Sequence, residues 1–241
     1  RSNMQPVAVV TGGARRIGRV IATHLHGLGF DIALHYRSSA AEAEALAAEL
    51  CATRGDSCRL FRADLEHPAG ASALAGEILA RYPAVDLLVN NASAFEPTPI
   101  ETCTPDQFER MLASNLRGPY FLVQGLLPGL RAASGKIVNI LDVHVDRPLP
   151  QFNAYGAAKS GLTSLTRSLA VALAPGIRVN ELALGAVMAP EVPPADYVHT
   201  TRDQLPMGKF PSLDEVTNAM MFLLGNGNLT GQTIFVDGGQ R

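Results

Sequence analysis

The residues with the clearest chemical potential are Tyr155 and Lys159, in the run Y-G-A-A-K that opens a long helical pattern. Side chains four residues apart project from one face of a helix, so the Lys159 ammonium group can lie beside the Tyr155 hydroxyl group. A free phenol has a pKa of about 10, which a neighbouring positive charge lowers toward neutral pH. We therefore expect Lys159 to lower the pKa of Tyr155, and Tyr155 to donate a proton. The alternative is a chance pair on an exposed helix face, because this spacing is common.

A second feature is a glycine-containing turn, T-G-G-A-R-R-I-G at residues 11–18, which directly follows an apolar run and opens a helix. Small residues let the backbone approach a pyrophosphate closely, and the free N–H groups and the dipole at a helix start favour negative charge. The turn predicts a dinucleotide site, and the alternative is a tight strand-to-helix connection without a ligand. The contacts are expected from Gly12, Arg15, Arg16, Ile17 and Gly18.

The segment at the end of the second apolar run selects between NAD and NADP. Enzymes that use NAD usually place an acidic side chain about 20 residues beyond the first glycine, where it binds the ribose 2′-hydroxyl. Here the segment is H-Y-R-S-S, without an acid, and Arg37 can bind a 2′-phosphate through charge-assisted hydrogen bonds. The alternative is a solvated basic turn followed by a helix N-cap. The sequence favours NADPH, with contacts from His35, Tyr36, Arg37, Ser38 and Ser39.

The elements that must position these residues alternate along the chain. Short apolar runs are separated by longer helical patterns, which is typical of βαβ units wound into a parallel sheet. Most of the runs are continuously hydrophobic, as strands buried on both faces are. The sequence predicts an α/β fold, a single-domain Rossmann-type doubly wound sheet of about seven mostly parallel strands with helices on both faces. The strands are expected to begin at Val7, Asp31, Ser57, Asp86, Lys136, Ile177 and Thr233.

One NADP-binding domain is expected over residues 4–241. Helix starts are indicated by Ser39 with Glu42, and by Thr104 with Gln107, three residues later in each case. Proline and glycine interrupt the periodicity around residues 190–211, so we expect a substrate lid around residues 189–210. Residues 1–3 precede Met4 and are interpreted as an expression remnant outside the fold.

The composition favours a cytoplasmic protein with a small-molecule ligand. A formal net charge of −2 leaves no basic stripe for nucleic acid or an anionic membrane, so neither is an expected partner. No apolar run approaches the ~18 residues of a membrane span. Three cysteines without C-x-x-C spacing fit reduced thiols. The six histidines lack the spacing or the carboxylate partners of a metal site, so no metal is expected.

Several motifs occur in one order along the chain: the turn at Thr11, N-N-A-S after the fourth strand, Asn115, Tyr155 with Lys159, and a terminal V-D-G-G. On these motifs the chain is identified as a member of the short-chain dehydrogenase/reductase family, which it resembles over essentially its whole length. The resemblance implies a proton-relay group of Asn115, Tyr155 and Lys159, in which Lys159 also holds the nicotinamide ribose.

The same resemblance implies further cofactor contacts and an oligomer. Homotetramers predominate in this family, and the apolar helical stretches at residues 108–127 and 162–173 are the surfaces expected to pair across a two-fold axis. Asp64 and Leu65 are expected to flank the adenine. The remaining cofactor contacts are expected from Asn91, Ala92, Ser93 and Gly185.

Asp142 departs from the pattern of most members, which have a serine at this position, 13 residues before the tyrosine, to hold a substrate carbonyl. A carboxylate is a poor partner for a ketone oxygen but a good acceptor from the N–H groups of an aminopyrimidine ring. Asp142 therefore argues against a simple ketone substrate. The alternative is that Asp142 caps a strand or pairs with Arg147.

Three segments resemble the pteridine reductases within the family: the phosphate turn with Arg16, the run L-H-Y-R-S-S-A-A-E-A, and the run N-N-A-S-A-F-E-P-T-P. The resemblance implies that Phe95 stacks on one face of a pterin while the nicotinamide covers the other; the alternative is that Phe95 anchors its loop in the core. It also implies that Ser93 and Arg16 bond to the substrate or to a cofactor phosphate. Two places depart from the pattern. A leucine-glycine pair replaces the usual proline-glycine after the sixth strand, and the arginine near the ribose comes one residue earlier, at Arg37.

We therefore predict NADPH-dependent reduction of a dihydropteridine such as dihydromonapterin, dihydrobiopterin or dihydrofolate, by hydride transfer to a C=N bond. Tyr155 is expected to donate or relay the proton, Asp142 to orient Tyr155 and help carry the proton, and Asn115 to link the site to water. Two alternatives stay open: a reductase of another carbonyl, such as a 3-oxoacyl thioester or a sugar, and a regulatory protein that binds NADPH without turnover. Substrate contacts are predicted for Arg16, Ser93, Phe95, Asp142 and Tyr155.

Overall fold

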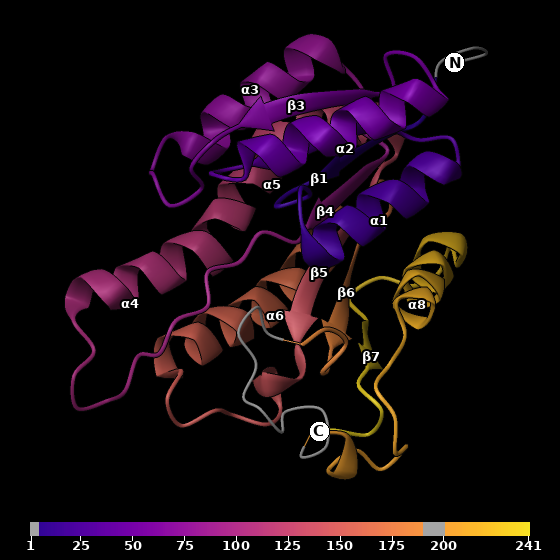
Figure 1. Ribbon diagram of the computed structural model, residues 1–241. Coiled ribbons are helices and arrows are strands. Elements are labelled where there is room, and N and C mark those ends of the chain that lie inside the picture. The colour runs from indigo at the N-terminus through magenta and orange to yellow at the C-terminus, as the bar shows by residue number, and fades with distance from the viewer. Residues whose placement is uncertain (1–4, 190–200) are drawn as a thin grey trace.

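Seven strands form one parallel sheet in the order β3-β2-β1-β4-β5-β6-β7 (Figure 1). The computed structural model describes residues 5–189 and 201–241. Each strand begins within one residue of its expected start, and the predicted fold class is confirmed. The strands are β1 (Val7–Val10), β2 (Asp31–Tyr36), β3 (Cys58–Arg62), β4 (Leu87–Asn90), β5 (Lys136–Asp142), β6 (Arg178–Leu184) and β7 (Thr233–Val236).

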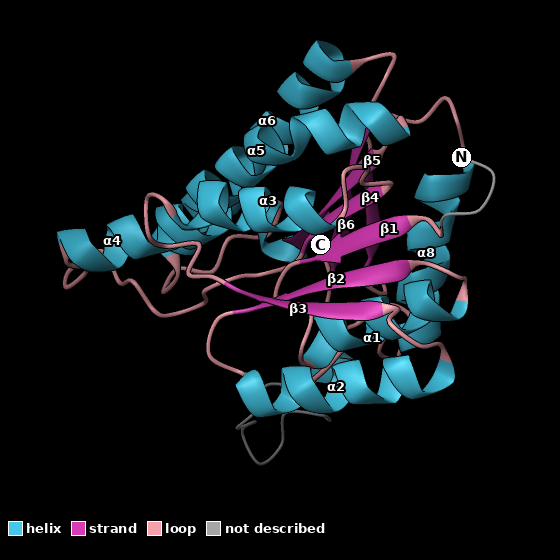
Figure 2. Ribbon diagram, turned by 90° about the horizontal axis from the view of Figure 1, so that it is seen from above, coloured by secondary structure: helices cyan, strands magenta, loops and turns pink. Residues whose placement is uncertain are grey.

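Helices cover both faces of this sheet (Figure 2). Helices α1, α2 and α8 lie on one face, and α3, α5 and α6 lie on the other. The described helices are α1 (Arg16–Gly27), α2 (Ala40–Thr53), α3 (Gly70–Arg81), α4 (Pro105–Leu112), α5 (Gly118–Ala133), α6 (Asn153–Leu173) and α8 (Leu213–Gly225), with a π-helical turn at Ala113–Arg117 and a 3-10 turn at Val143–Val145.

The uninterrupted apolar sequence of β1 reflects the burial of both faces of the sheet under helices. Successive side chains of a strand point to opposite faces. Val7 and Val9 join the hydrophobic cluster under α3 and α5, whereas Ala8 and Val10 join the cluster under α1, α2 and α8. All four residues are buried, so the strand needs an uninterrupted apolar run rather than alternation.

The strand order reverses at β1, which pairs with β2 on one side and with β4 on the other. Ligands of doubly wound sheets bind outside the carboxyl ends of the strands at such a switch point. The glycine-containing turn follows β1 here and the N-N-A-S segment follows β4. The fold therefore brings two of the predicted motifs to the same edge of the sheet.

The two predicted helix starts differ in the structure. The capping box at Thr104 is confirmed, because the Thr104 hydroxyl accepts from the Gln107 N–H (3.2 Å) and the Gln107 side chain accepts from the Thr104 N–H (2.9 Å). The helix start predicted at Ser39 is also confirmed, since α2 begins at Ala40 with Ser39 as its N-cap, but Ser39 makes no side-chain capping bond. Ser39 has a ψ of 58°, outside the extended region of most N-caps, and Glu42 instead lies 3.7 Å from the Arg15 guanidinium.

The apolar helix expected over residues 108–127 is interrupted. Helix α4 ends at Leu112, the π-helical turn follows, and α5 begins at Gly118. Such π-helical turns add a residue to the helical path and often accompany functional sites. A Cβ at Gly118 would lie 3.0 Å from the Leu65 side chain and 3.1 Å from the Ala113 oxygen, so the junction needs glycine to pack.

Part of the predicted lid, residues 190–200, lies outside the described residues, as do residues 1–3. The described part packs on the C-terminal segment, where the Met207 N–H donates to the Gly238 oxygen (3.1 Å) and Leu205 is buried. No helix in the described parts of the chain is long and apolar enough to cross a membrane. Within the same parts, no three His, Cys, Asp or Glu side chains gather as a metal site would require.

Candidate active site

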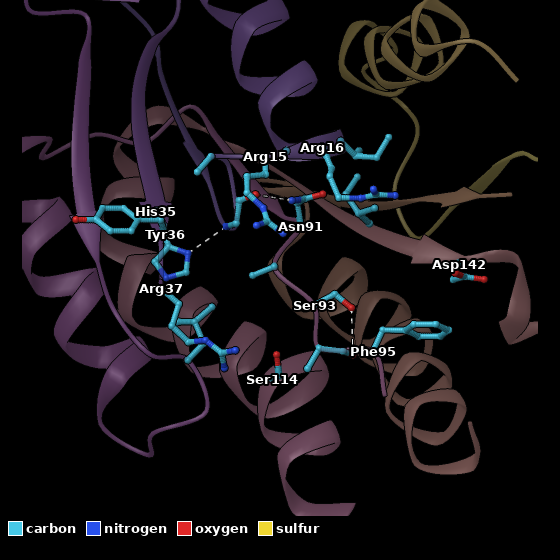
Figure 3. Close-up of a pocket in the computed structure, with 18 of the residues that line it drawn as sticks. Arg15, Arg16, His35, Tyr36, Arg37, Asn91, Ser93, Phe95, Ser114 and Asp142 are labelled. Atoms are coloured by element: carbon cyan, nitrogen blue, oxygen red, sulfur yellow. Dashed lines mark hydrogen bonds between the residues drawn. The ribbon is translucent and has the colours of Figure 1, made fainter. Parts of the chain in front are cut away.

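A cavity of about 490 Å³ opens at the carboxyl ends of the strands (Figure 3). Every residue predicted to contact cofactor or substrate lines this cavity, and Asn115 alone of the predicted catalytic residues does not. Arg37 lies at one end of the close-up, and Phe95 and Asp142 lie at the other. Lining residues that sequence analysis missed mostly neighbour the predicted ones: Ala14, Glu66, Ala94, Ser114, Ile140, Leu141, Leu184, Val187 and Met188.

The phosphate turn is held in place by the end of β4. The Thr11 hydroxyl accepts from the backbone N–H groups of Asn91 and Ala92, both at 2.9 Å. The Asn91 amide donates in turn to the carbonyl oxygens of Thr11 (3.0 Å) and Gly12 (3.1 Å). A Cβ at Gly18 would lie 2.2 Å from the Gly12 oxygen, so only glycine fits there. The turn is thus a rigid cradle of backbone atoms at the start of α1.

His35 ties this cradle to β2 and β3. Its Nδ1 accepts from the Gly12 N–H at 3.1 Å, and its Nε2 lies 3.1 Å from the Ala63 carbonyl oxygen. Because the first partner can only donate and the second can only accept, the ring is neutral with its hydrogen on Nε2. Burial lowers the pKa of His35, which favours this neutral form.

At one end of the cavity, the basic side chain of Arg37 is paired with two acidic side chains. The Arg37 guanidinium bonds to Glu66 and lies 3.9 Å from the Asp64 carboxylate. Arg16, with a φ of 50°, donates to the Ala189 carbonyl oxygen at 2.8 Å, which links the phosphate turn to the start of the predicted lid. Glu66 was missed in the sequence because a lone acid after β3 carries no signal of its partner.

At the other end, Tyr155 and Lys159 project from the first turns of α6 toward the end of β5. The Tyr155 hydroxyl donates to Asp142 Oδ2 at 3.5 Å. The Lys159 ammonium group donates to the Ile140 carbonyl oxygen at 3.1 Å and lies 5.8 Å from the centre of the Tyr155 ring. Both side chains are buried. Tyr155 and Asp142 therefore form the contact that sequence analysis predicted.

The expected effect of Lys159 on Tyr155 is corrected by the structure. Burial raises the pKa of Tyr155, the negative charge of Asp142 raises it further, and a hydrogen bond from Ser93 offsets only part of this. The reason is geometric, because the carboxylate contacts the phenol oxygen while the ammonium group binds the Ile140 carbonyl. Burial lowers the pKa of Lys159 itself to about 8, against the opposing charges of Asp142 and Glu181.

Asp142 also caps the 3-10 turn that follows β5. Its Oδ1 accepts from the His144 backbone N–H at 2.8 Å and lies 3.6 Å from His144 Nε2. The alternative in which Asp142 caps a strand end is therefore partly true, but its second oxygen faces Tyr155. The guanidinium of Arg147 donates to the Gln240 carbonyl oxygen (2.7 Å). The Asp142 carboxylate thus caps the 3-10 turn with one oxygen and contacts Tyr155 in the cavity with the other.

Asn115 lies in the π-helical turn, fully buried behind the cavity wall. Its Oδ1 accepts from the Ser93 hydroxyl at 2.7 Å, and its amide donates to the carbonyl oxygens of Ala94 (2.9 Å) and Met111 (3.0 Å). The side chain holds the segment that carries Phe95, a task different from the predicted link to water.

Phe95 belongs to an aromatic cluster at the cavity mouth. Its ring stacks on Phe152 with centroids 4.2 Å apart and planes 6° apart, and meets Tyr155 edge to face at 4.8 Å. Phe95 is nevertheless 55% exposed. Phe152 was not predicted from the sequence, where its only signal is its place three residues before Tyr155. The Thr98 hydroxyl accepts from the Ala154 N–H (3.1 Å) and so joins the Phe95 segment to α6.

Known proteins resemble this chain over nearly its whole length. A family model described as enoyl-(acyl carrier protein) reductase matches residues 12–241. Pteridine reductase 1 of Leishmania tarentolae is 34% identical over 280 residues, with 97% of this chain and 96% of that protein covered. The 3-oxoacyl-[acyl-carrier-protein] reductase FabG of Staphylococcus aureus is 31% identical over 242 residues, with 98% of each covered.

Solved structures resemble it as well. FolM alternative dihydrofolate reductase 1 from Brucella canis, complexed with NADP, has a TM-score of 0.89 at 34% identity, covering 98% of this chain and 93% of that one. The corresponding protein from Brucella suis, also in complex with NADP, has a TM-score of 0.90 at 36% identity, covering 98% and 94%.

Proposed function

This chain belongs to the short-chain dehydrogenase/reductase family, and from that premise we propose that it uses NADPH to reduce the C=N bond of a dihydropteridine. The observation that carries the proposal is the contact of Asp142, rather than of a serine, with the Tyr155 hydroxyl. A carboxylate accepts readily from the N–H groups of an aminopyrimidine ring and is a poor partner for a ketone oxygen. The similarity to pteridine reductase 1 and to the alternative dihydrofolate reductases supports the same substrate class.

The cradle after β1 fits a dinucleotide. Its backbone approaches a ligand without side chains in the way, because Gly12 lies against Ala92 and Gly18 lies against Gly12. Arg37, Ser38 and Ser39 line the end of the cavity where a 2′-phosphate would lie, and Glu66 holds the Arg37 guanidinium in position. NADPH bound there supplies the hydride. The NADP complexes of the two Brucella proteins support this choice of cofactor.

The aromatic cluster fits a flat heteroaromatic substrate. Phe152 covers one face of Phe95, and the Phe95 side chain remains 55% exposed, which leaves ring surface for a pterin to stack on. Stacked aromatic pairs contribute roughly 0.5–1.5 kcal/mol beyond the burial of their area. Asp142, at the same end of the cavity, is within reach of the polar edge of such a ring (Figure 3).

The Tyr155 hydroxyl carries the proton for the nitrogen of the C=N bond. The raised pKa keeps this hydroxyl protonated at neutral pH, so the proton is present when substrate binds. The negative charge of Asp142 opposes formation of a phenolate beside it. Transfer from Tyr155 is therefore favoured when a second proton reaches Asp142.

Reduction of a 3-oxoacyl thioester is the second candidate, favoured by the 31% identity to the FabG reductase. In that reaction the group beside Tyr155 must donate a hydrogen bond to a carbonyl oxygen, which an ionised carboxylate does not do. A regulatory protein that binds NADPH without turnover is the third candidate, and it predicts no NADPH oxidation with any substrate.

The experiment is NADPH oxidation by the wild-type chain and by Asp142→Ser, with dihydromonapterin, dihydrobiopterin, dihydrofolate and an acetoacetyl thioester as substrates. We expect a dihydropteridine to be reduced, and kcat/KM to fall about 10- to 100-fold in Asp142→Ser, because hydrogen bonds to charged groups contribute roughly 1.5–3 kcal/mol. Asp146→Ser, a matched change at an exposed position four residues on, should leave kcat/KM unchanged.

Turnover of the thioester alone would contradict the pteridine proposal and favour the carbonyl reductase. NADPH binding without oxidation in any mixture would favour the regulatory protein.

A further inference from the structure

We propose that His144 is the proton entrance of this active site and that it acts on Tyr155 through Asp142. The inference rests on the proposed function only in requiring that Tyr155 deliver a proton, which holds for a C=N or a C=O substrate alike. His144 is in this sense a positioning residue, because it reaches the reacting atoms only through another side chain.

The Asp142 carboxylate lies between the two groups. Its Oδ2 accepts from the Tyr155 hydroxyl at 3.5 Å, and its Oδ1 lies 3.6 Å from His144 Nε2. The second distance is that of an ion pair rather than of a hydrogen bond. Hydrogen bonds at catalytic groups are often long in the free enzyme and shorten when substrate binds. The three groups thus form a continuous path from the end of β5 to α6.

The orientation of the His144 ring is set by its other nitrogen. Nδ1 lies 2.9 Å from the Arg147 carbonyl oxygen, which can only accept, so Nδ1 carries a hydrogen. This bond leaves Nε2 directed at Asp142. The His144 side chain is 19% exposed, so the ring also reaches solvent. Imidazole exchanges protons with water near neutral pH more readily than any other side chain.

Two other members of the predicted relay lie away from solvent among the described residues. Asn115 is fully buried, and both N–H groups of its amide are bonded, to Ala94 and Met111. Lys159 is buried and its ammonium group binds the Ile140 carbonyl. His144, 19% exposed, is a proton carrier that directly faces the carboxylate of Asp142, which is itself 31% exposed.

The proton balance is simple. Reduction of the double bond takes a hydride, with its electron pair, from NADPH and one proton from Tyr155. Protonated His144 gives its Nε2 proton to Asp142 Oδ1, and a half-turn about the Asp142 Cβ–Cγ bond, which has broad two-fold preferences, presents that proton to Tyr155. Tyr155 regains this proton as it releases its own to the substrate nitrogen, and His144 is reprotonated by water. Asp142 ends as a carboxylate again.

The charges around His144 leave Asp142 as its direct partner. Arg241 pairs with Asp146 at 3.9 Å and with Asp237 at 3.7 Å, so both of these carboxylates already have a cationic partner. The Arg147 guanidinium is directed at the Gln240 carbonyl. The titratable and charged groups around this turn are Asp142 from β5, Asp146 and Arg147 from the loop, Tyr155 and Lys159 from α6, and Asp237 and Arg241 from the C-terminal segment.

The test is His144→Asn, compared with His67→Asn as a matched control at an exposed turn. An asparagine amide can keep the bond to the Arg147 carbonyl but cannot carry a proton, so this variant separates loop structure from proton supply. We measure kcat, KM, the NADPH dissociation constant, the solvent deuterium isotope effect and rescue by imidazole, with the best substrate of the wild-type chain.

We expect kcat of His144→Asn to fall by about 10²-fold, the lower end of what positioned proton transfer contributes. KM and the NADPH dissociation constant should stay within about twofold, the solvent isotope effect should rise, and added imidazole should restore part of kcat. Wild-type kcat and isotope effect in His144→Asn would overturn the proposal, and so would a loss confined to KM or NADPH binding. Failure of the wild-type chain to reduce any substrate would overturn the proposed function first, and this inference with it.

Discussion

Tyr155 and Lys159 are both buried, and their pKa values are shifted in opposite directions, which determines the acid–base behaviour of the candidate site. Burial raises the pKa of Tyr155 and lowers that of Lys159 to about 8. At neutral pH this arrangement leaves the phenol protonated and most of the Lys159 population charged. Desolvation accounts for both directions, because it disfavours the charged form of either group. Of these two groups, Lys159 is therefore the one whose charge changes near neutral pH.

The pH profile of kcat/KM for NADPH tests this assignment at Lys159. This parameter reports on the free enzyme. Lys159 loses its charge as the pH rises through about 8, so we expect kcat/KM to fall above that pH. Lys159→Arg keeps its charge throughout, because a guanidinium stays protonated in proteins, and it should lack the alkaline limb even if its overall rate is lower. An identical limb in Lys159→Arg would contradict the assignment.

At the scale of elements, the site depends on how neighbouring strand ends are joined. Asn91 and Thr11 lock the ends of β4 and β1 together, and His35 locks the phosphate turn to β2 and β3. The π-helical turn between α4 and α5 holds the segment that carries Phe95, because it places Asn115 where its side chain bonds to Ser93 and Ala94. These contacts fix loops that helical or strand hydrogen bonding alone would leave free.

The His35 contact predicts a pH dependence of folding. The bond from the Gly12 N–H requires neutral His35, whose pKa in the fold is lowered by burial below 6.5. As the pH falls from about 6.5 toward that lower value, the unfolded chain takes up a proton that the folded chain does not, so stability decreases. His35→Asn can still accept from Gly12 but does not titrate.

Thermal unfolding of the free protein between about pH 5 and about pH 7.5 measures this effect, since the window brackets the pKa of an unperturbed histidine. The midpoint temperature of the wild-type chain should fall more steeply toward acid than that of His35→Asn. Parallel curves for the two proteins would mean that His35 does not contribute.

At the scale of the whole molecule, the cavity is lined by residues at or after the carboxyl ends of β1, β2, β3, β4, β5 and β6. A cofactor in this cavity contacts most of the sheet edge at once and binds the folded chain only. Its binding free energy therefore adds to the stability of the fold. The homotetramer implied by the family resemblance stays a prediction. One of the two helical surfaces expected to pair in it, at residues 108–127, is interrupted by the π-helical turn at residues 113–117.

NADPH at about 100 times its dissociation constant should stabilise the fold by about 2.7 kcal/mol, which corresponds to roughly 5–10 °C in Tm for a chain of this size. NADH at the same concentration should give a smaller shift, because it lacks the 2′-phosphate that Arg37, Ser38 and Ser39 are proposed to bind. Equal shifts from NADH and NADPH would contradict the predicted preference for NADP. Differential scanning fluorimetry provides the measurement.

The sequence by itself determined the fold class, the strand starts to within one residue, and most of the residues that line the cavity. These features are local, because an uninterrupted apolar run marks a doubly buried strand and a glycine turn marks the start of the next helix. Asp142 stood out for a different reason, because the family resemblance implies a serine at this position, 13 residues before Tyr155; the structure places Asp142 at the end of β5, where it contacts Tyr155. The box at Ser212 and Glu215, which sequence analysis did not single out, follows the same local rule as the one at Thr104.

Only the tertiary structure decided how these residues act on one another. The pKa of Tyr155 rises because burial and Asp142 outweigh its other neighbours, and neither burial nor the position of Lys159 can be derived from spacing along a helix. The contacts of Glu66 with Arg37 and of His144 with Asp142 also depend on the tertiary structure, because the conformations of loops and turns determine where these side chains point. Periodicity predicts where a side chain is placed, but its charge state and its partner depend on everything that packs around it.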